Sequence, residues 1–156
     1  MSKPLSSQEA LHKAAAYCSS SEQCRYDITE KLRRWGVENE DVLKIIEHLV
    51  QQNFIDEARY SKGFVNDKFR FNKWGRIKII YALRQKKIPE NLISEAINTI
   101  DKDQYVKTLR EILETKCKGM KATDNYDMQA KLFRFAVSRG FEPDIIQIVF
   151  HNMKPS

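Results

Sequence analysis

Cationic and aromatic side chains alternate over a short stretch near the middle of this 156-residue chain. Residues 68–78 read Lys-Phe-Arg-Phe-Asn-Lys-Trp-Gly-Arg-Ile-Lys. Cations attract phosphates and carboxylates, and exposed aromatic rings can stack on nucleic-acid bases. The pattern therefore favours binding of an anionic partner. For the aromatic residues we prefer a structural interpretation, in which Phe64, Phe69, Phe71 and Trp74 pack between neighbouring helical units.

The excess positive charge of the chain comes from this region alone. Residues 62–87 hold nine Lys or Arg and one acid, a net charge of +8, whereas the remaining 130 residues hold 18 basic and 20 acidic side chains. A solvated helix face rarely needs so much charge of one sign. We therefore predict an anionic or acidic partner here, and the charge alone fits DNA, RNA or an acidic protein groove. The candidate binding residues are Arg59, Lys68, Arg70, Lys73, Arg76, Lys78, Arg84, Lys86 and Lys87.

Catalytic and metal-binding patterns are missing from the sequence. No Gly-rich phosphate loop and no GxGxxG motif occur, and His12, His48 and His151 lack zinc-ligand spacing. Cys18 and Cys24 have no evident His or basic activator, so we interpret them as buried or incidental thiols. We therefore expect no catalysis, no cofactor and no metal. Three cysteines without paired spacing indicate a reducing compartment, and we expect a cytoplasmic protein without a membrane span.

Helical periodicity dominates the elements that must position these side chains, so we predict an all-α fold. Ser6-Ser7-Gln8-Glu9 reads as a capping box, and Gly36 can take the left-handed conformation in which helices often end. Start and stop signals predict nine helices. They cover residues from 6 to about 18, 25–35 and 39–52, begin near 56, 76 and 89, cover 103–117 and 127–138, and begin at 143.

The helices repeat in groups of three. Leu32–Val37 aligns with Leu83–Ile88 at an offset of 51, and Gly36-Val37 aligns with Gly140-Phe141 at an offset of 104. The helix that follows each turn matches in all three copies. This periodicity predicts three tandem three-helix units at residues 1–55, 56–102 and 103–156. A single irregular helical domain is the alternative.

Three-helix units with basic charge also suggest helix-turn-helix modules that read the major groove of DNA. The third helix of each unit would then approach phosphates. Those helices are acidic instead, with Glu38, Glu40, Asp41 and Glu47 in the first unit and Glu90, Glu95 and Asp101 in the second. Basic residues lie mainly on the second helices, so sequence-specific reading of bases is disfavoured.

Phe54-Ile55-Asp56-Glu57-Ala58-Arg59-Tyr60-Ser61 is followed by Phe64-Val65, then by Gly75-Arg76-Ile77-Lys78 and Leu83–Ile88, and later by Arg139-Gly140-Phe141. In order and spacing, these residues resemble the signature of the RecX family of RecA regulators. Lys87 stands where that family usually has glycine. The resemblance covers roughly residues 10–153.

This resemblance implies three tandem helical modules in an elongated, curved arrangement. It also implies a protein that lies in the groove of the RecA–DNA filament and inhibits filament growth, ATP hydrolysis and strand exchange. Recombination and the SOS response would decrease in consequence. We expect this protein to be a monomer. Two alternatives remain: a stand-alone nucleic-acid-binding module that contacts single- or double-stranded DNA, and a helical scaffold with an unrelated acidic partner.

Overall fold

The computed structural model describes residues 4–153, which form nine α-helices and no strand. The helices are α1 (Ser7–Ser20), α2 (Arg25–Arg34), α3 (Asn39–Gln51), α4 (Glu57–Arg70), α5 (Arg76–Gln85), α6 (Glu90–Ile97), α7 (Lys102–Lys118), α8 (Asn125–Ser138) and α9 (Pro143–Met153). The all-α prediction is confirmed, and the helix starts and ends lie within a few residues of those expected.

Side-chain caps fix where several helices begin. Ser6 and Glu9 form the predicted capping box, in which each side chain accepts a backbone N–H of the other residue. Asp56, Asp101 and Asp124 accept backbone N–H groups at the starts of α4, α7 and α8. These bonds satisfy donors that the first helical turn leaves free.

One turn recurs at the end of the second helix of each group of three. Gly36, Lys87 and Gly140 occupy equivalent positions with φ of +83°, +59° and +97°. The next residue donates its N–H to the carbonyl five residues earlier in all three copies, at 3.1–3.2 Å. This is the hydrogen bond of a Schellman motif, which favours glycine in the left-handed position. The sequence repeat therefore corresponds to a repeated backbone geometry.

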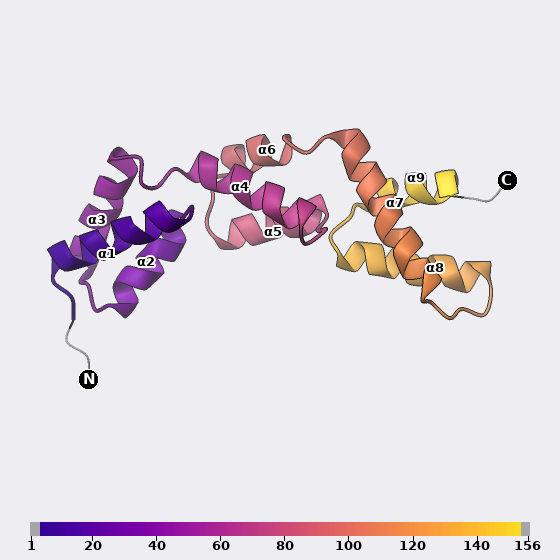
Figure 1. Ribbon diagram of the computed structural model, residues 1–156, viewed down its shortest axis with the longest axis horizontal. Helices are drawn as coiled ribbons and strands as arrows, with labels where there is room; N and C mark the ends of the chain where they lie inside the picture. The colour runs from indigo at the N-terminus through magenta and orange to yellow at the C-terminus, as the bar shows by residue number, and fades with distance from the viewer. Residues whose placement is uncertain (1–3, 154–156) are drawn as a thin grey trace.

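The helices lie in a row of three groups along the long axis, with the two chain ends at opposite ends of the row (Figure 1). We call α1–α3, α4–α6 and α7–α9 the first, second and third helix groups. The elongated repeat arrangement is thus as predicted. The exact unit boundaries at 55/56 and 102/103 stay a prediction, and residues 1–3 and 154–156 of the outer units lie outside the described residues.

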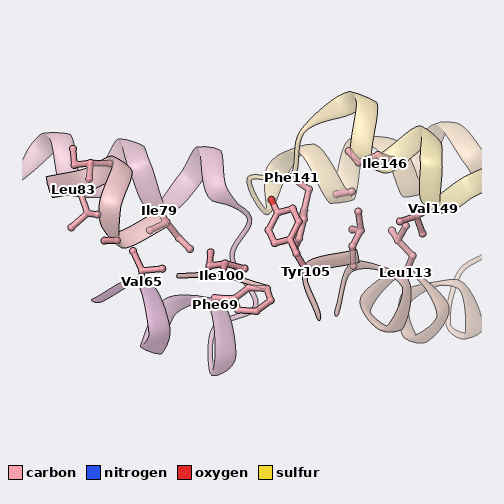
Figure 2. Close-up of a cluster of buried hydrophobic side chains, with 14 of the residues drawn as sticks. Val65, Phe69, Ile79, Leu83, Ile100, Tyr105, Leu113, Phe141, Ile146 and Val149 are labelled. Atoms are coloured by element: carbon pink, nitrogen blue, oxygen red, sulfur yellow. The ribbon is translucent and has the colours of Figure 1, made fainter. Parts of the chain in front are cut away.

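The row contains two hydrophobic cores. The first group buries its own core, which includes Ile28, Leu32 and Leu49. The second and third groups share one continuous core, which runs from Leu83 and Ile79 to Ile146 and Val149 (Figure 2). Burial of apolar surface stabilises by about 25 cal/mol per Å². Because the shared core crosses the joint between the second and third groups, apolar burial stabilises the contact between them.

Aromatic side chains fill the centre of that shared core. Phe69 of α4, Tyr105 of α7 and Phe141 lie side by side, with ring centroids 5.7 and 5.1 Å apart along the series (Figure 2). Phe69 thus packs between groups, as predicted. Phe71 does not: its side chain is 77% exposed, so the predicted packing of Phe71 is wrong.

The buried face of α5 is not the one that a spacing of three residues would select. That spacing groups Ile77, Ile80 and Leu83, but Ile77 is 51% exposed and Ile80 is only partly buried. Ile79 and Leu83, four residues apart, are fully buried instead. Apolar residues spaced by three and by four are both compatible with one helix face, and packing against the neighbouring helices selects between them.

Candidate interaction surface

The nine predicted binding residues divide into two sets. Four form ion pairs within the chain: Arg59, Arg76, Arg84 and Lys86. In the described part of the chain, the other five have no carboxylate at ion-pair distance: Lys68, Arg70, Lys73, Lys78 and Lys87. The second set is free to attract an external anion.

Two of the paired cations join the first helix group to the second. Arg59 Nε lies 2.5 Å from Glu22 Oε1, and Lys86 Nζ lies 2.6 Å from Asp27 Oδ1. The hydrogen bond with Asp27 raises the pKa of Lys86. Both pairs connect residues more than 35 positions apart. Arg59 and Lys86 therefore orient the first group, which their charge alone did not suggest.

Cys24 lies at the same joint and packs in the shared core. It is fully buried, and burial raises the pKa of its thiol from 9.0 to about 11. Burial likewise raises the pKa of Cys18, and both cysteines are free. A thiol with a raised pKa is a poor nucleophile at neutral pH because the thiolate is scarce. The geometry agrees with interpreting these cysteines as structural.

Arg76 serves the joint between the second and third groups. Its guanidinium lies 3.9 Å from the centre of the Tyr105 ring and pairs with Glu142 at 2.9 Å. The Tyr105 hydroxyl accepts the backbone N–H of Arg76 and donates to Glu142. Burial is the main cause that raises the pKa of Tyr105. Arg76 is thus largely committed to holding the two groups together.

Lys68 and Lys78 flank a tryptophan on the surface of the second group. Their ammonium groups lie 4.8 and 4.6 Å from the centre of the Trp74 ring. The π electrons of the ring attract both ammonium groups, so each forms a cation–π interaction. Lys68 also approaches Phe64 at 5.5 Å. Both ammonium groups keep capacity for an anion. We call Lys68, Lys78 and Trp74 the Lys–Trp–Lys cluster.

Two clefts adjoin at the joint between the second and third groups. The α4–α7 cleft, of about 580 Å³, includes Arg70, Phe71 and Gln104. The α7–α8 cleft, of about 440 Å³, includes Lys116, Phe135 and Arg139. Lys73 and Thr108 line both clefts, so the two form one track along α7.

The third group contributes residues to this track that the sequence analysis did not predict as binding residues. Lys116 and Arg139 lie 5.0 and 5.8 Å from the centre of the Phe135 ring, and Arg139 donates to the Asn72 carbonyl at 2.9 Å. They lie more than 28 positions beyond the basic residues 62–87. The available signal was the helical period, which places Phe135 and Arg139 four residues apart on one face.

Residues 4–153 contain neither a cluster of metal ligands nor a membrane-spanning helix. No group of three or more His, Cys, Asp or Glu side chains there could hold a metal ion. No helix in that range is long and apolar enough to cross a bilayer.

Two protein-family models and several proteins of known family match the sequence of this chain. The model of the RecX second three-helix domain matches residues 56–97, and the model of the RecX third three-helix domain matches residues 103–150. The regulatory protein RecX of Prosthecochloris aestuarii is 30% identical over 140 residues, which cover 90% of each chain. That of Clostridium botulinum strain Eklund 17B is 32% identical over 124 residues, or 78% of this chain. This match spans only 58% of the length of the clostridial relative.

Solved structures show the same fold. The crystal structure of RecX from Lactobacillus salivarius superposes with a TM-score of 0.85, at 20% identity, over 94% of this chain and 96% of the other. The relatives carry the name of regulatory proteins. From the two matching domain models and the near full-length relative, we conclude that this chain belongs to the RecX family.

Proposed function

We propose that this chain is a non-catalytic regulator that binds the RecA–DNA filament and inhibits its growth, ATP hydrolysis and strand exchange. Recombination and the SOS response would be reduced in consequence. Membership of a family of regulatory proteins supports the proposal. The structural observation that carries it is the set of second-group cations that have no carboxylate partner among residues 4–153, which includes both lysines of the Lys–Trp–Lys cluster.

The shape of the molecule suits a long, repetitive partner. Three helix groups in a row present successive surfaces along one axis (Figure 1). A filament repeats its subunits along an axis, so one elongated chain can bridge neighbouring subunits and oppose their exchange. The central cations would meet acidic subunit surfaces or phosphate, and this attraction weakens as salt increases. We further propose that the protein acts as a monomer in the cytoplasm.

The direct test measures ATP hydrolysis by RecA on single-stranded DNA with the protein added. We expect inhibition that saturates near a stoichiometric ratio. Unchanged hydrolysis at stoichiometric excess would contradict the proposal.

A matched pair of variants assigns the surface. Lys68→Glu combined with Lys78→Glu reverses the Lys–Trp–Lys cluster, and we expect weaker filament binding and weaker inhibition. Lys44→Glu combined with Lys107→Glu changes the net charge equally at exposed positions outside the cluster. Equal loss in both variants would show that only net charge matters. Arg76 is unsuitable for this test because its pairing with Glu142 supports the fold.

A stand-alone nucleic-acid-binding module is the second candidate, favoured by the exposure of Phe71 beside Arg70. Binding to bare single-stranded DNA and to preformed RecA filament, compared at one salt concentration, separates the two. Preference for the filament supports the first proposal, and equal binding supports the second.

A further inference from the structure

The track along α7 has the composition of a binding site. Its two clefts contain four cations and two carboxylates: Arg70, Lys73, Lys116 and Arg139 against Asp101 and Glu111. Asp101 is already used, since its side chain accepts the Gln104 backbone N–H at 2.9 Å. The track therefore presents a net positive surface that also contains the aromatic side chains of Phe71 and Phe135.

Phe71 is the unusual member of this surface. It follows the last residue of α4 and is 77% exposed on the wall of the α4–α7 cleft, between Arg70 and Lys73 in the chain. Leaving an aromatic ring in water costs the burial that Phe69, two residues earlier, obtains in the core. A ring with this exposure can stack on a planar ligand.

Lys73 is held where the two clefts meet. Its φ of +58° is a left-handed conformation that a lysine adopts only when the surrounding structure imposes it. Here the Trp74 N–H that follows donates to the Lys68 carbonyl at 3.1 Å, which closes the turn. The turn thus places Lys73 on both cleft walls, where its ammonium has no carboxylate partner among residues 4–153.

Thr108 adds a polar group to the floor of the track. It is only 4% exposed, and its hydroxyl oxygen accepts from Gln104 Nε2 at a long 3.5 Å. Within the described residues the hydroxyl hydrogen has no acceptor. Buried hydroxyls normally find an acceptor, so this donor is available to a ligand that enters either cleft.

We propose that this track binds single-stranded nucleic acid, with one unstacked base on Phe71 and backbone phosphates along Lys73, Lys116 and Arg139. Cations that follow a backbone beside an aromatic platform are the common solution for sequence-tolerant binding of single strands. An acidic peptide would use the cations but gain little from the exposed ring. The inference extends the proposed function, because a RecA filament carries DNA, yet its test omits RecA so that each can fail alone.

The experiment compares two oligonucleotides of equal length, oligo(dT) and an abasic strand with the same phosphates, by fluorescence anisotropy. Phe71→Leu should weaken oligo(dT) binding about 5- to 100-fold, the range expected for loss of one stacked base, and leave abasic binding unchanged. Tyr81→Leu removes another exposed aromatic ring, on α5 and outside both clefts, and should change neither.

Salt dependence tests the phosphate contacts. Three phosphate contacts, at Lys73, Lys116 and Arg139, predict a slope of log K against log salt of about −2, since each contact contributes about −0.7. Lys116→Gln should make the slope shallower by about 0.7, whereas Lys118→Gln, two residues further along α7 and outside the cleft lining, should not.

Three outcomes overturn the proposal. Equal effects of Phe71→Leu and Tyr81→Leu on oligo(dT) would exclude stacking at this site. Equal loss of oligo(dT) and abasic binding in Phe71→Leu would show that the ring supports the cleft without contacting a base. Binding of poly-glutamate as tight as that of oligo(dT) would assign the track to an acidic protein.

Discussion

The backbones of Gly75 and Gly140 are in direct contact across the joint between the second and third helix groups. The Gly75 N–H donates to the Arg139 carbonyl at 2.7 Å, and the Gly140 carbonyl accepts from Ile77 at 3.0 Å. A Cβ added to Gly75 would overlap the Gly140 carbonyl carbon and oxygen. Two segments 65 residues apart are thus bonded through their main chains at a point where only glycine fits.

Gly75→Ala should therefore destabilise the protein. The φ of Gly75 is −78°, so alanine causes no backbone strain, and the cost is overpacking of about 1–3 kcal/mol. Urea unfolding measures the change. Gly63→Ala is the control with the opposite sign, since Gly63 lies within α4 with no atom near an added Cβ. Alanine there should stabilise by up to about 1 kcal/mol. Equal unfolding free energies for the two variants would contradict the steric explanation.

Lys87→Gly should stabilise the protein by about 0.5–1 kcal/mol. Lys87 has a φ of +59° at the Schellman position, where Gly36 and Gly140 occupy the other two copies. Relief of left-handed strain outweighs the added flexibility of glycine in the unfolded chain. Thermal or urea unfolding measures the gain. Lys87→Gln removes the charge and keeps the strain, and it should leave stability nearly unchanged. A similar gain in Lys87→Gln would attribute the effect to charge.

High salt should loosen the joint between the first and second helix groups but not the joint between the second and third. Arg59–Glu22, Lys86–Asp27 and Arg25–Glu57 are partly exposed ion pairs, which salt screens. Apolar packing of Phe69, Tyr105 and Phe141 is not weakened in this way.

Fluorescence energy transfer can follow both joints. Dyes introduced through unnatural amino acids at the exposed positions Leu43 and Tyr81 report the first joint, and dyes at Tyr81 and Tyr126 report the second. We expect a broader distance distribution with salt for the first dye pair only. The same broadening for both pairs would show that ion pairs do not distinguish the joints.

Unfolding should become easier as pH rises from 9 to 11. The pKa of Cys24 is raised from 9.0 to about 11, so the unfolded chain releases a proton that the folded chain keeps. This contribution is fully present below pH 9 and is lost as pH approaches 11; it is worth about 1–3 kcal/mol. Cys24→Ala should give a shallower decrease, with the remainder due to the raised pKa values of Tyr60 and Tyr105. Identical pH profiles would show that Cys24 does not contribute.

Local elements could be predicted from the sequence because their causes are local. The capping box at Ser6 and the left-handed turns at Gly36 and Gly140 depend on residues within one or two helical turns. The repeat offset then predicted the equivalent turn that ends at Lys87, although lysine is a poor residue for it. The arrangement of helices in threes follows from these signals.

The candidate surface could be predicted only in part, because charge in a sequence does not reveal its partner. Arg59, Arg76 and Lys86 are among the nine predicted binding residues. The carboxylates with which they form ion pairs lie 37, 66 and 59 positions away in the sequence. Likewise Phe69 and Phe71 are two positions apart, and this spacing directs their side chains to opposite sides of the helix axis. Which of the two is buried depends on where Tyr105 of α7 arrives.

The shared core of the second and third groups has a consequence for cooperativity. Ising-like repeat proteins unfold in blocks whose size depends on how strongly neighbouring repeats couple. Here one coupling passes through Phe69, Tyr105 and Phe141, and the other mainly through ion pairs around the buried Cys24. Amide hydrogen exchange should therefore separate α1–α3 from a single six-helix block, with the smaller block opening first.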